Sequence, residues 1–578
     1  MRRPAKPSRA VCGPASMEVP RQEESRGGTV TRAGWEVQGV TSRDDALQRL
    51  GDERFDLLVI GGGITGAGIA LDAAARGMRV ALVERDDFAT GTSSRSSKLI
   101  HGGLRYLAHL EVGLVREALA ERGVLQRLAP FLVIPTPFVV PRIGKRRLLP
   151  LRAGLQAYDV LAVGSRFPRH RILDADAART YAPALREEVS GGFLYWDART
   201  DDARLVWTVV RTAADHGAAV VNHAPVTRFL HDARGRASGA VVRDTESGRE
   251  VEVRARVIVN ATGVWSDEVR RMEDPAGVQG IRPSKGVHLT FPASAIDAHS
   301  ALLVPAPDGR YVFVIPWVDE TVIVGTTDDD YRGPLGTPRA EPADIDYLIA
   351  TVNRVLARPV SRSEVLASWA GLRPLIQRPG QTTKDLSRRH RVVVGAAGIV
   401  TITGGKLTAY RPMAADAVDA ALEAGGFESR PPSNTASVRL AGGAEGKGAV
   451  ERIEAGLRRL GLPLDHGLRL YRRYGSRTAE VLGLVAQEPD LAEPLHPSLP
   501  YLRAEAAYAM DVEMARRPND VLSHRLRARI TSSDRGVAAL DWVTDRLAKA
   551  GAWDEDRRLQ EAARYRQEVA DDVGADQA

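Results

Sequence analysis

The chain has 578 residues, 44% of them hydrophobic and 26% charged, and a net charge of +7. This length allows two or more domains with cores of their own. The single cysteine, Cys12, excludes an internal disulfide and a cysteine-based metal site, and the modest charge argues against a nucleic-acid-binding protein. The sequence shows no cluster of metal ligands, and no apolar run reaches the length of about 18 residues that a membrane-spanning helix needs.

The chain is expected to divide into four parts. Residues 1–39 carry charges throughout and lack the apolar core of a signal peptide, so we interpret them as a disordered arm, with Met17 as an alternative start. Residues 40–433 form the main folded part. Residues 434–447 are rich in Ala and Gly and indicate a linker. Residues 448–578 have apolar side chains at helical spacing and predict a helical domain.

A dinucleotide-binding motif follows the arm. Phe55–Ile60 is a short apolar run typical of a buried strand, and it leads into GGGITG, which contains Gly61, Gly63 and Gly66. In this pattern the first glycine allows a tight turn, the second lets the backbone approach a pyrophosphate, and the third lets helix and strand pack closely. The following helix presents free N–H groups to the phosphates. Glu84 ends the next apolar strand, where a carboxylate would accept hydrogen bonds from ribose hydroxyls.

Two later segments bear on which dinucleotide is bound. The apolar strand in 256–267 ends in Ala261-Thr262-Gly263, and a strand near residue 400 leads into Gly404-Gly405-Lys406 and then a helix. The dinucleotide-binding domain is therefore predicted to be discontinuous. Reduced flavin carries negative charge, which a helix N-terminus and the Lys406 ammonium would stabilise. This spacing favours a flavin over a nicotinamide cofactor without excluding the latter.

The middle of the chain carries no catalytic pattern of its own. Residues 206–254 alternate apolar and polar side chains with turn signals, which predicts hairpin strands. The stretch YVFVIPWVDETVIVGTTDDDY, at residues 311–331, predicts two strands joined by an Asp-Glu turn. Such strands suit a sheet that covers a flavin site.

One basic segment bears on location. Residues 141–161 combine Arg142, Lys145, Arg146, Arg147 and Arg152 with leucines. That composition is typical of a segment that lies at an anionic membrane surface. An ordinary basic surface loop would share it, so both interpretations stay open.

The sequence resembles the FAD-dependent glycerol-3-phosphate dehydrogenases over nearly all of the chain after the arm. The matching stretches follow one another from Val59 to Arg411: VIGGGITGAGIALDAAARG, SSRSSKLIHGGLRYL, DDARLV, NATGVWSD, KGVHLTF, FVIPW, GTTDDDY, AGLRPL, LSRRH and GGKLTAYR. The stretches LYRRYGSR and AMDVEMARRPNDVLSHR are similar to the family's helical cap. The resemblance implies an α/β fold, in which a Rossmann-like FAD-binding domain is interleaved with an antiparallel-sheet substrate domain and followed by a C-terminal helical cap domain.

The resemblance also implies a substrate site. Glycerol 3-phosphate is a dianion with a secondary alcohol at C2, and its phosphate suits the forked donors of arginine. The positions that match substrate-binding residues are Arg105, Tyr106, Arg373, Arg388, Lys406 and Thr408, with Arg389 as a neighbouring register for Arg388. The predicted catalytic residues are Arg373 and a base, for which His288 is the first candidate and His101 the second, since neutral imidazole suits that role near pH 7.

The predicted cofactor is non-covalent FAD. In this family the stretch matching Ser96–Tyr106 lies against the flavin and borders the substrate. The positions that match FAD-binding residues are Gly61, Gly63, Ile64, Thr65, Gly66, Glu84, Thr92, Ser93, Ser94, Ser97, Lys98, Leu99, His101, Gly103, Val226, Ala261, Gly263, Gly405, Lys406, Leu407 and Thr408.

The electron acceptor is not determined by the motifs. We expect a dehydrogenase that passes electrons to quinone as a peripheral protein on the cytoplasmic face of the membrane, and the family suggests a homodimer. The alternatives are a soluble oxidase that uses oxygen, an amine or amino-acid oxidase of related fold, and a flavin-binding membrane scaffold without catalysis. A scaffold needs no such set of charged residues as Arg105, His288, Arg373, Arg388 and Lys406, and an amino-acid oxidase needs fewer cations for its single carboxylate.

Overall fold

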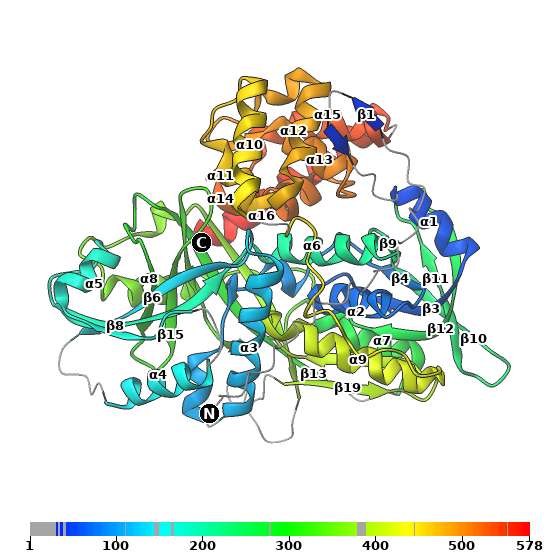
Figure 1. Ribbon diagram of the computed structural model, residues 1–578, viewed down its shortest axis with the longest axis horizontal. Coiled ribbons are helices and arrows are strands. Elements are labelled where there is room, and N and C mark those ends of the chain that lie inside the picture. The colour runs from blue at the N-terminus through cyan, green and yellow to red at the C-terminus, as the bar shows by residue number, and fades with distance from the viewer. Residues whose placement is uncertain are drawn as a thin grey trace, which may run out of the picture.

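The computed structural model describes residues 30–32, 35–37, 42–109, 111–143, 149–162, 167–276, 279–377, 389–443, 446–551 and 553–577. Two bodies built around sheets lie side by side, and a helical body sits above them (Figure 1). This is the predicted fold class: a Rossmann-like domain interleaved with a mostly antiparallel sheet domain and followed by a helical domain.

The first body is built on an eight-stranded sheet with a parallel centre. In spatial order its strands are β10 (Val226–His231), β11 (Ala237–Arg243), β12 (Glu250–Asn260), β3 (Arg54–Ile60), β4 (Val80–Val83) and β9 (Ala219–Val221), while β20 (Val400–Gly404) pairs with β12 and β19 (His390–Val394) with β20. The chain leaves this sheet after β12 and returns to it at β19, so the domain is discontinuous, as predicted.

Alternation along β3 explains why this sheet is covered on both faces. Leu57 and Val59 belong to one buried core, and Leu58 and Ile60 belong to another on the opposite face. The helices that take part in these two cores are α1 (Arg43–Asp52), α2 (Ile64–Ala75), the end of α3 (Val112–Leu128), α6 (Asp202–Asp215) and α9 (Tyr410–Gly425). Because parallel strands are buried on both faces, they are nearly continuous apolar runs in the sequence.

Helix α6 differs from the sequence expectation. Residues 206–254 were predicted as hairpin strands, which is correct for β10, β11 and β12 but wrong for the first ten residues. Val206, Val209, Val210 and Ala213 recur at helical spacing, and all four are buried in the core that α6 shares with α2. The β-branched valines suggest a strand, but burial of this stripe favours the helix.

The second body is a ten-stranded, mostly antiparallel sheet. In spatial order its strands are β17 (Asp329–Asp330), β13 (Ile281–Pro292), β16 (Thr321–Gly325), β15 (Tyr311–Pro316), β14 (Ala301–Pro305), β6 (Ile134–Ile143), β8 (Val189–Arg199) and β5 (Leu99–Ile100), with β18 (Ala367–Ile376) beside β13 and β7 (Arg171–Leu173) beside β8. The predicted hairpin at 311–325 is confirmed: β15 and β16 pair, and Asp319 and Glu320 in the turn have φ angles of 53° and 54°. Of the remaining helices before the cap, α7 (Ser266–Glu273) packs against the nucleotide-binding sheet, and the others are α4 (Leu149–Leu161), α5 (Ala175–Tyr181) and α8 (Pro342–Asn353).

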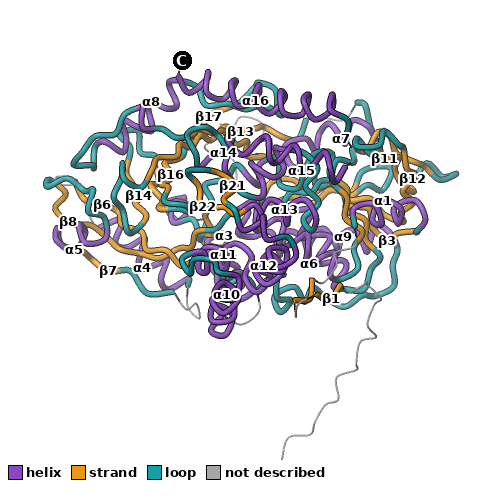
Figure 2. The backbone as a smooth tube through the Cα atoms, turned by 90° about the horizontal axis from the view of Figure 1, so that it is seen from above, coloured by secondary structure: helices purple, strands orange, loops and turns teal. Residues whose placement is uncertain are grey.

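The C-terminal domain is helical, as predicted. Its elements are α10 (Gly446–Leu460), α11 (His466–Tyr474), α12 (Thr478–Gln487), the hairpin β21 (Pro494–His496) and β22 (Leu499–Leu502), α13 (Arg503–Asp511), the π-helical turn η8 (Asp520–Arg525), α14 (Ala528–Thr531), α15 (Leu540–Gly551) and α16 (Glu555–Gln577). Figure 2 shows α16 stretched along one side of the molecule, where it contacts α8 and β18. The cap therefore reaches the back of a strand that carries the predicted site residue Arg373.

The two segments predicted to be irregular differ in what the structure describes. Within the predicted arm, β1 (Val30–Arg32) and β2 (Trp35–Val37) form a short antiparallel hairpin, where the sequence predicted no regular structure; residues 1–29, 33–34 and 38–41 lie outside the described part. The predicted linker is tied to the nucleotide-binding body, because the Ala441 amide donates to Thr212 Oγ1 and Leu440 is buried.

Candidate active site

The glycine loop before α2 forms one side of a cavity of about 330 Å³. Gly61 has a φ angle of +107°, and a Cβ there would lie 2.8 Å from the carbonyl oxygen of Ala261. A Cβ on Gly66 would lie 1.8 Å from the carbonyl oxygen of Gly61, so helix and loop pack closely only because that position is glycine. The loop thus leaves backbone N–H groups and the helix N-terminus open to a ligand phosphate.

Glu84 lies where the sequence predicts a carboxylate that binds the ribose hydroxyls. It follows β4 and lines the 330 Å³ cavity, and its Oε2 accepts a hydrogen bond of 2.6 Å from the Gly62 amide. Its Oε1 accepts from the Asp86 amide at 2.9 Å. Burial raises the pKa of Glu84, while these two amides favour its ionised form. The residues and their spacing fit the adenosine end of a dinucleotide.

Replacing Glu84 with alanine should therefore deplete the purified protein of FAD. The change removes both the ribose acceptor and the hydrogen bond that holds the glycine loop. FAD content and affinity are measured by absorbance and by reconstitution of the apoprotein. Glu250→Ala, an exposed change on β12, is the matched control. Full FAD content and unchanged affinity in Glu84→Ala would show that the placement is wrong.

A larger cavity, of about 1130 Å³, continues from the first. Both cavities are lined by Ile64, Thr92, Ser93, Gly405 and Lys406, so an elongated ligand can extend from one into the other. The walls of the larger cavity come from both sheets and from the 3-10 helix η2 (Leu104–His109). The combined shape suits a dinucleotide that carries a flat ring system at the far end.

Most of the predicted site residues line these two cavities. They are Gly61, Gly63, Ile64, Thr65, Glu84, Thr92, Ser93, Ser97, Leu99, His101, Gly103, Tyr106, Val226, Ala261, Gly263, His288, Arg373, Gly405, Lys406, Leu407 and Thr408. They come from eight separate parts of the sequence, and the two sheets bring them together.

Three predicted residues lie outside the cavity linings, and for two the structure describes no side chain. Gly66 serves packing, as described above. Ser94 is buried, and its carbonyl oxygen accepts from Lys98 Nζ at 3.0 Å. Lys98 lies outside both cavity linings: its side chain is fully buried and donates to Asp202 Oδ1 at 2.8 Å, so its contact with the cofactor stays a prediction. Burial lowers the pKa of Lys98 to about 8, and the positive charge of Arg527 adds to this effect. Arg105 lies in η2, and Arg388 lies outside the described residues.

His288 is held in the wall of the larger cavity. It lies on β13 and stacks on Trp369 of the neighbouring strand β18, with ring centroids 5.1 Å apart and planes at 8°. Its Nε2 is 2.8 Å from the Ser97 hydroxyl, and only 2% of the residue is exposed. Burial lowers the pKa of His288 well below its usual value, and the charges of Arg373 and Lys98 add to this effect. The imidazole is therefore neutral near pH 7, as a general base requires.

His101, the second candidate base, lines the same cavity. Its ring packs edge-on against Phe313, with centroids 6.3 Å apart, and its backbone amide donates to Thr408 Oγ1 at 3.2 Å. Both histidines are thus within the site, and their environments differ: His288 is enclosed and desolvated, whereas His101 is half-buried.

Two cations, Arg373 and Lys406, line the same cavity as the histidines. The Arg373 guanidinium is oriented by the Thr327 carbonyl oxygen at 3.1 Å and the Asp328 carboxylate at 3.3 Å, with 28% of its side chain exposed. Lys406 Nζ lies 3.6 Å from the centroid of the Tyr106 ring. Thr326, Thr327 and Asp328 line the site but were missing from the predicted set. The GTTDDDY motif contains all three, so the signal was present in the sequence.

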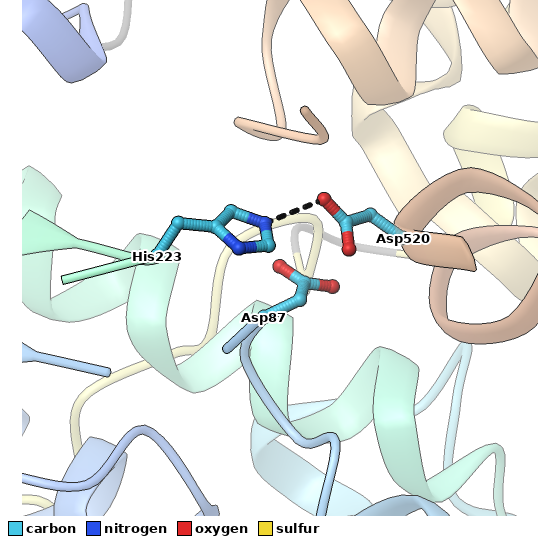
Figure 3. A group of neighbouring side chains, drawn as sticks. All are labelled: Asp87, His223 and Asp520. Atoms are coloured by element: carbon cyan, nitrogen blue, oxygen red, sulfur yellow. Dashed lines mark hydrogen bonds and ion pairs between the residues drawn. The ribbon is translucent and has the colours of Figure 1, made fainter. Parts of the chain in front are cut away.

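A separate group of side chains has the geometry of a metal site. Ligand atoms of Asp87, His223 and Asp520 lie within 4.8 Å of one another, between the nucleotide-binding body and the cap (Figure 3). However, Asp87 is paired with Arg525 at 2.6 Å, and His223 Nε2 is 2.8 Å from Asp520 Oδ2. Burial alone would lower the pKa of His223, but Asp520 outweighs it and raises that pKa. Asp520 favours the protonated imidazole and Arg525 already pairs with Asp87, so these contacts form an ion-pair network between domains.

The comparisons with known proteins agree with this site. The family model for FAD dependent oxidoreductases matches residues 56–411, and the model for the C-terminal domain of alpha-glycerophosphate oxidase matches residues 433–558. Glycerol-3-phosphate dehydrogenase 2 of Mycobacterium tuberculosis is 43% identical over 94% of this chain and 94% of its own. The aerobic glycerol-3-phosphate dehydrogenase of Bacillus subtilis is 36% identical over 89% of this chain and 94% of its own.

Solved structures give the same result. The glycerol-3-phosphate dehydrogenase of Bacillus halodurans, complexed with FAD, superimposes with a TM-score of 0.75 at 31% identity, over 92% of this chain and 97% of that one. L-alpha-glycerophosphate oxidase from Mycoplasma pneumoniae shares the fold, with a TM-score of 0.52 at 18% identity over 66% of this chain. The chain therefore belongs to the FAD-dependent glycerol-3-phosphate dehydrogenase family, and its cofactor is FAD.

Proposed function

We propose that this protein oxidises sn-glycerol 3-phosphate to dihydroxyacetone phosphate and passes the electrons to quinone. The observation that carries the proposal is the convergence of Arg373 and Lys406 with the neutral His288 in one cavity that continues from the dinucleotide cradle. Two cations suit a phosphate dianion, and a neutral imidazole suits an alcohol that must lose its proton. The names of the relatives agree with this substrate.

The residues of this chain have separate roles in binding the substrate and in accepting its proton. Bound FAD supplies the oxidising chemistry by accepting the hydrogen and two electrons that leave C2. Arg373 is already oriented by Thr327 and Asp328, so it can donate to the phosphate without reorganising. The proton of the C2 hydroxyl ends on Nε2 of His288, the ring nitrogen directed at the cavity-lining Ser97. Enclosure of the imidazole keeps it neutral before the reaction.

An apolar end of the larger cavity supports quinone as the acceptor. This end is lined by Leu104, Leu107, Val112, Pro150 and Leu151, and Val112 on α3 is also exposed to solvent. A flat, lipid-soluble molecule can reach a flavin ring through such walls, whereas oxygen needs no apolar entrance.

The segment at 141–161 supports membrane docking chiefly through charge. Leu155 and Tyr158 of α4 are buried in the protein core, so they are not available to a lipid surface, while Val160 is 69% exposed. Lys145, Arg146 and Arg147 lie outside the described residues. Among the residues that the structure describes, no helix is long and apolar enough to cross a membrane. Docking would then be peripheral, at about 1 kcal/mol for each basic residue near an anionic surface.

Co-sedimentation with anionic vesicles, together with turnover using quinone and using oxygen, tests this part of the proposal. We expect binding at low salt that weakens as salt rises, because exposed charges are screened. Neutralising Arg146 and Arg147 should release the protein but leave activity with an artificial dye intact. Neutralising the exposed Arg234 and Arg249 on the β10–β12 meander is the matched control. No vesicle binding at low salt, combined with full turnover on oxygen, would contradict the proposal.

The second candidate function is a soluble glycerol-3-phosphate oxidase. The match of residues 433–558 to the C-terminal domain of alpha-glycerophosphate oxidase favours it. Hydrogen peroxide formed at the full rate of substrate oxidation would identify it. The expected homodimer stays a prediction, for which sedimentation equilibrium is the direct measurement.

A further inference from the structure

The buried Lys98, whose side chain lines neither cavity, belongs to a cluster that joins the cap to the active site. Its ammonium donates to Asp202 Oδ1 at 2.8 Å and to the Ser94 carbonyl oxygen at 3.0 Å. Arg527, from the loop between η8 and α14 of the cap, donates to the same two oxygens at 3.1 Å and 2.9 Å. Two cations from different domains therefore share the same pair of acceptors.

The cluster is enclosed, and its carboxylate is ionised. Lys98 and Asp202 are completely buried, and Arg527 is 2% exposed. Burial alone would raise the pKa of Asp202, but Lys98 and Arg527 outweigh it and lower that pKa, so the carboxylate is ionised. Lys98 and Arg527 also have left-handed φ angles of 57° and 71°, a backbone conformation that non-glycine residues rarely adopt. Such strain persists only where surrounding contacts hold it in place.

Asp202 also holds the segment that faces the substrate cavity, through hydrogen bonds to Ser96. Its Oδ2 accepts from both the backbone amide of Ser96, at 3.0 Å, and the Ser96 hydroxyl, at 2.7 Å. The Ser96 hydroxyl also accepts from the Lys98 amide at 2.9 Å. Ser94 to Lys98 is thus fixed on both sides of Ser97.

Ser97 is the residue that this segment presents to the reaction. It lines the 1130 Å³ cavity, and its hydroxyl is 2.8 Å from Nε2 of His288. His288 itself is held by its stack on Trp369, so movement of the Ser94–Lys98 segment would change the distance between the hydroxyl and Nε2. A hydroxyl can accept one proton while it donates another, which allows it to stand between a substrate alcohol and an enclosed imidazole.

We propose that Ser97 relays the substrate proton to Nε2 of His288, and that Arg527 of the cap is a positioning residue that holds Ser97 for this step. This inference rests on the proposed function. As the O–H bond at C2 breaks, Ser97 Oγ takes that proton and gives its own to Nε2, while the hydrogen on C2 leaves with two electrons to FAD. Serine ends unchanged, and His288 ends as imidazolium.

The test is the rate of flavin reduction after anaerobic mixing of the holoenzyme with glycerol 3-phosphate. Ser97→Ala and Arg527→Met should each lower the limiting rate about 100-fold, since small misplacements of a reacting group cost that much. The substrate concentration for half-maximal rate should stay near wild type, because neither change touches Arg373. Rates are compared per bound flavin, because Ser97 is also a predicted FAD-binding residue. The double variant should be little slower than Ser97→Ala alone, because Arg527 acts through that hydroxyl.

Arg525→Met is the matched control. Arg525 lies two residues before Arg527 and is equally buried, but its ion pair is with Asp87. It should lower the melting temperature as Arg527→Met does, yet reduce its flavin at the wild-type rate. Should Arg527→Met fail to fold, Arg527→Lys keeps one donor and should give an intermediate rate, while Ser97→Ala leaves the domain boundary intact.

Each contrary outcome identifies what is wrong. Ser97→Ala that reduces its flavin at the wild-type rate would overturn the relay. Equal slowing by Arg527→Met with and without Ser97→Ala would show that Arg527 does not act through Ser97. Wild-type FAD that glycerol 3-phosphate does not reduce would instead overturn the proposed function itself.

Discussion

Replacing Arg373 with alanine is expected to raise the KM for glycerol 3-phosphate by about 30- to 1000-fold while leaving FAD bound. Loss of one charge-assisted partner of a phosphate costs about 2–4 kcal/mol, and each 1.4 kcal/mol corresponds to a factor of ten. Arg373 is suited to this role because Thr327 and Asp328 hold its guanidinium at the cavity before substrate arrives. Steady-state kinetics with glycerol 3-phosphate and with glycerol measure the effect.

Arg282→Ala is the control for Arg373→Ala. Arg282 lies on β13, next to β18, and forms two hydrogen bonds of 2.8 Å to Asp330 outside both cavities. It should leave the KM unchanged. If wild-type protein oxidised glycerol as well as glycerol 3-phosphate, recognition of the phosphate by Arg373 and Lys406 would be refuted.

Replacing His288 with asparagine is expected to slow flavin reduction by about 10²–10⁴-fold, the range for loss of a positioned general base. Asparagine keeps a polar side chain in the enclosed site but cannot take a proton near pH 7. Because the pKa of His288 lies well below its ordinary value, the wild-type rate should show no titration of this residue between pH 6 and pH 8. Anaerobic stopped-flow measurements across that range test both statements.

His101→Asn distinguishes the two candidate bases. On this account it changes the reduction rate much less than His288→Asn does, because His101 is half-buried and packs on Phe313. The opposite ranking, with His101→Asn nearly inactive and His288→Asn active, would assign the base to His101.

The sequence was sufficient for the parts of the site that depend on local chain geometry. The spacing of Gly61, Gly63 and Gly66 requires a tight turn and a close helix, and Glu84 follows from the length of the next strand. Motifs of this kind encode backbone positions within one βαβ unit, so their geometry follows from nearby residues.

Residues whose role depends on distant partners were harder to assign. Lys98 lies in a motif that borders the cofactor, but it turns away because Asp202 and Arg527, far along the chain, form its environment. Leu155 was counted with a membrane-facing segment, whereas tertiary packing buries it. α6 has strand-like valines that become a buried helical stripe only against α2. In each case the deciding contact is with a separate element, which no local pattern encodes.

The central claim is that glycerol 3-phosphate delivers its electrons to FAD in the cavity between the two sheets. The most direct measurement is the absorbance of bound flavin after anaerobic mixing of the purified protein with glycerol 3-phosphate. We predict rapid bleaching with glycerol 3-phosphate and little with an equal concentration of glycerol. Flavin that stays oxidised with glycerol 3-phosphate, in protein shown to contain FAD, would contradict the account.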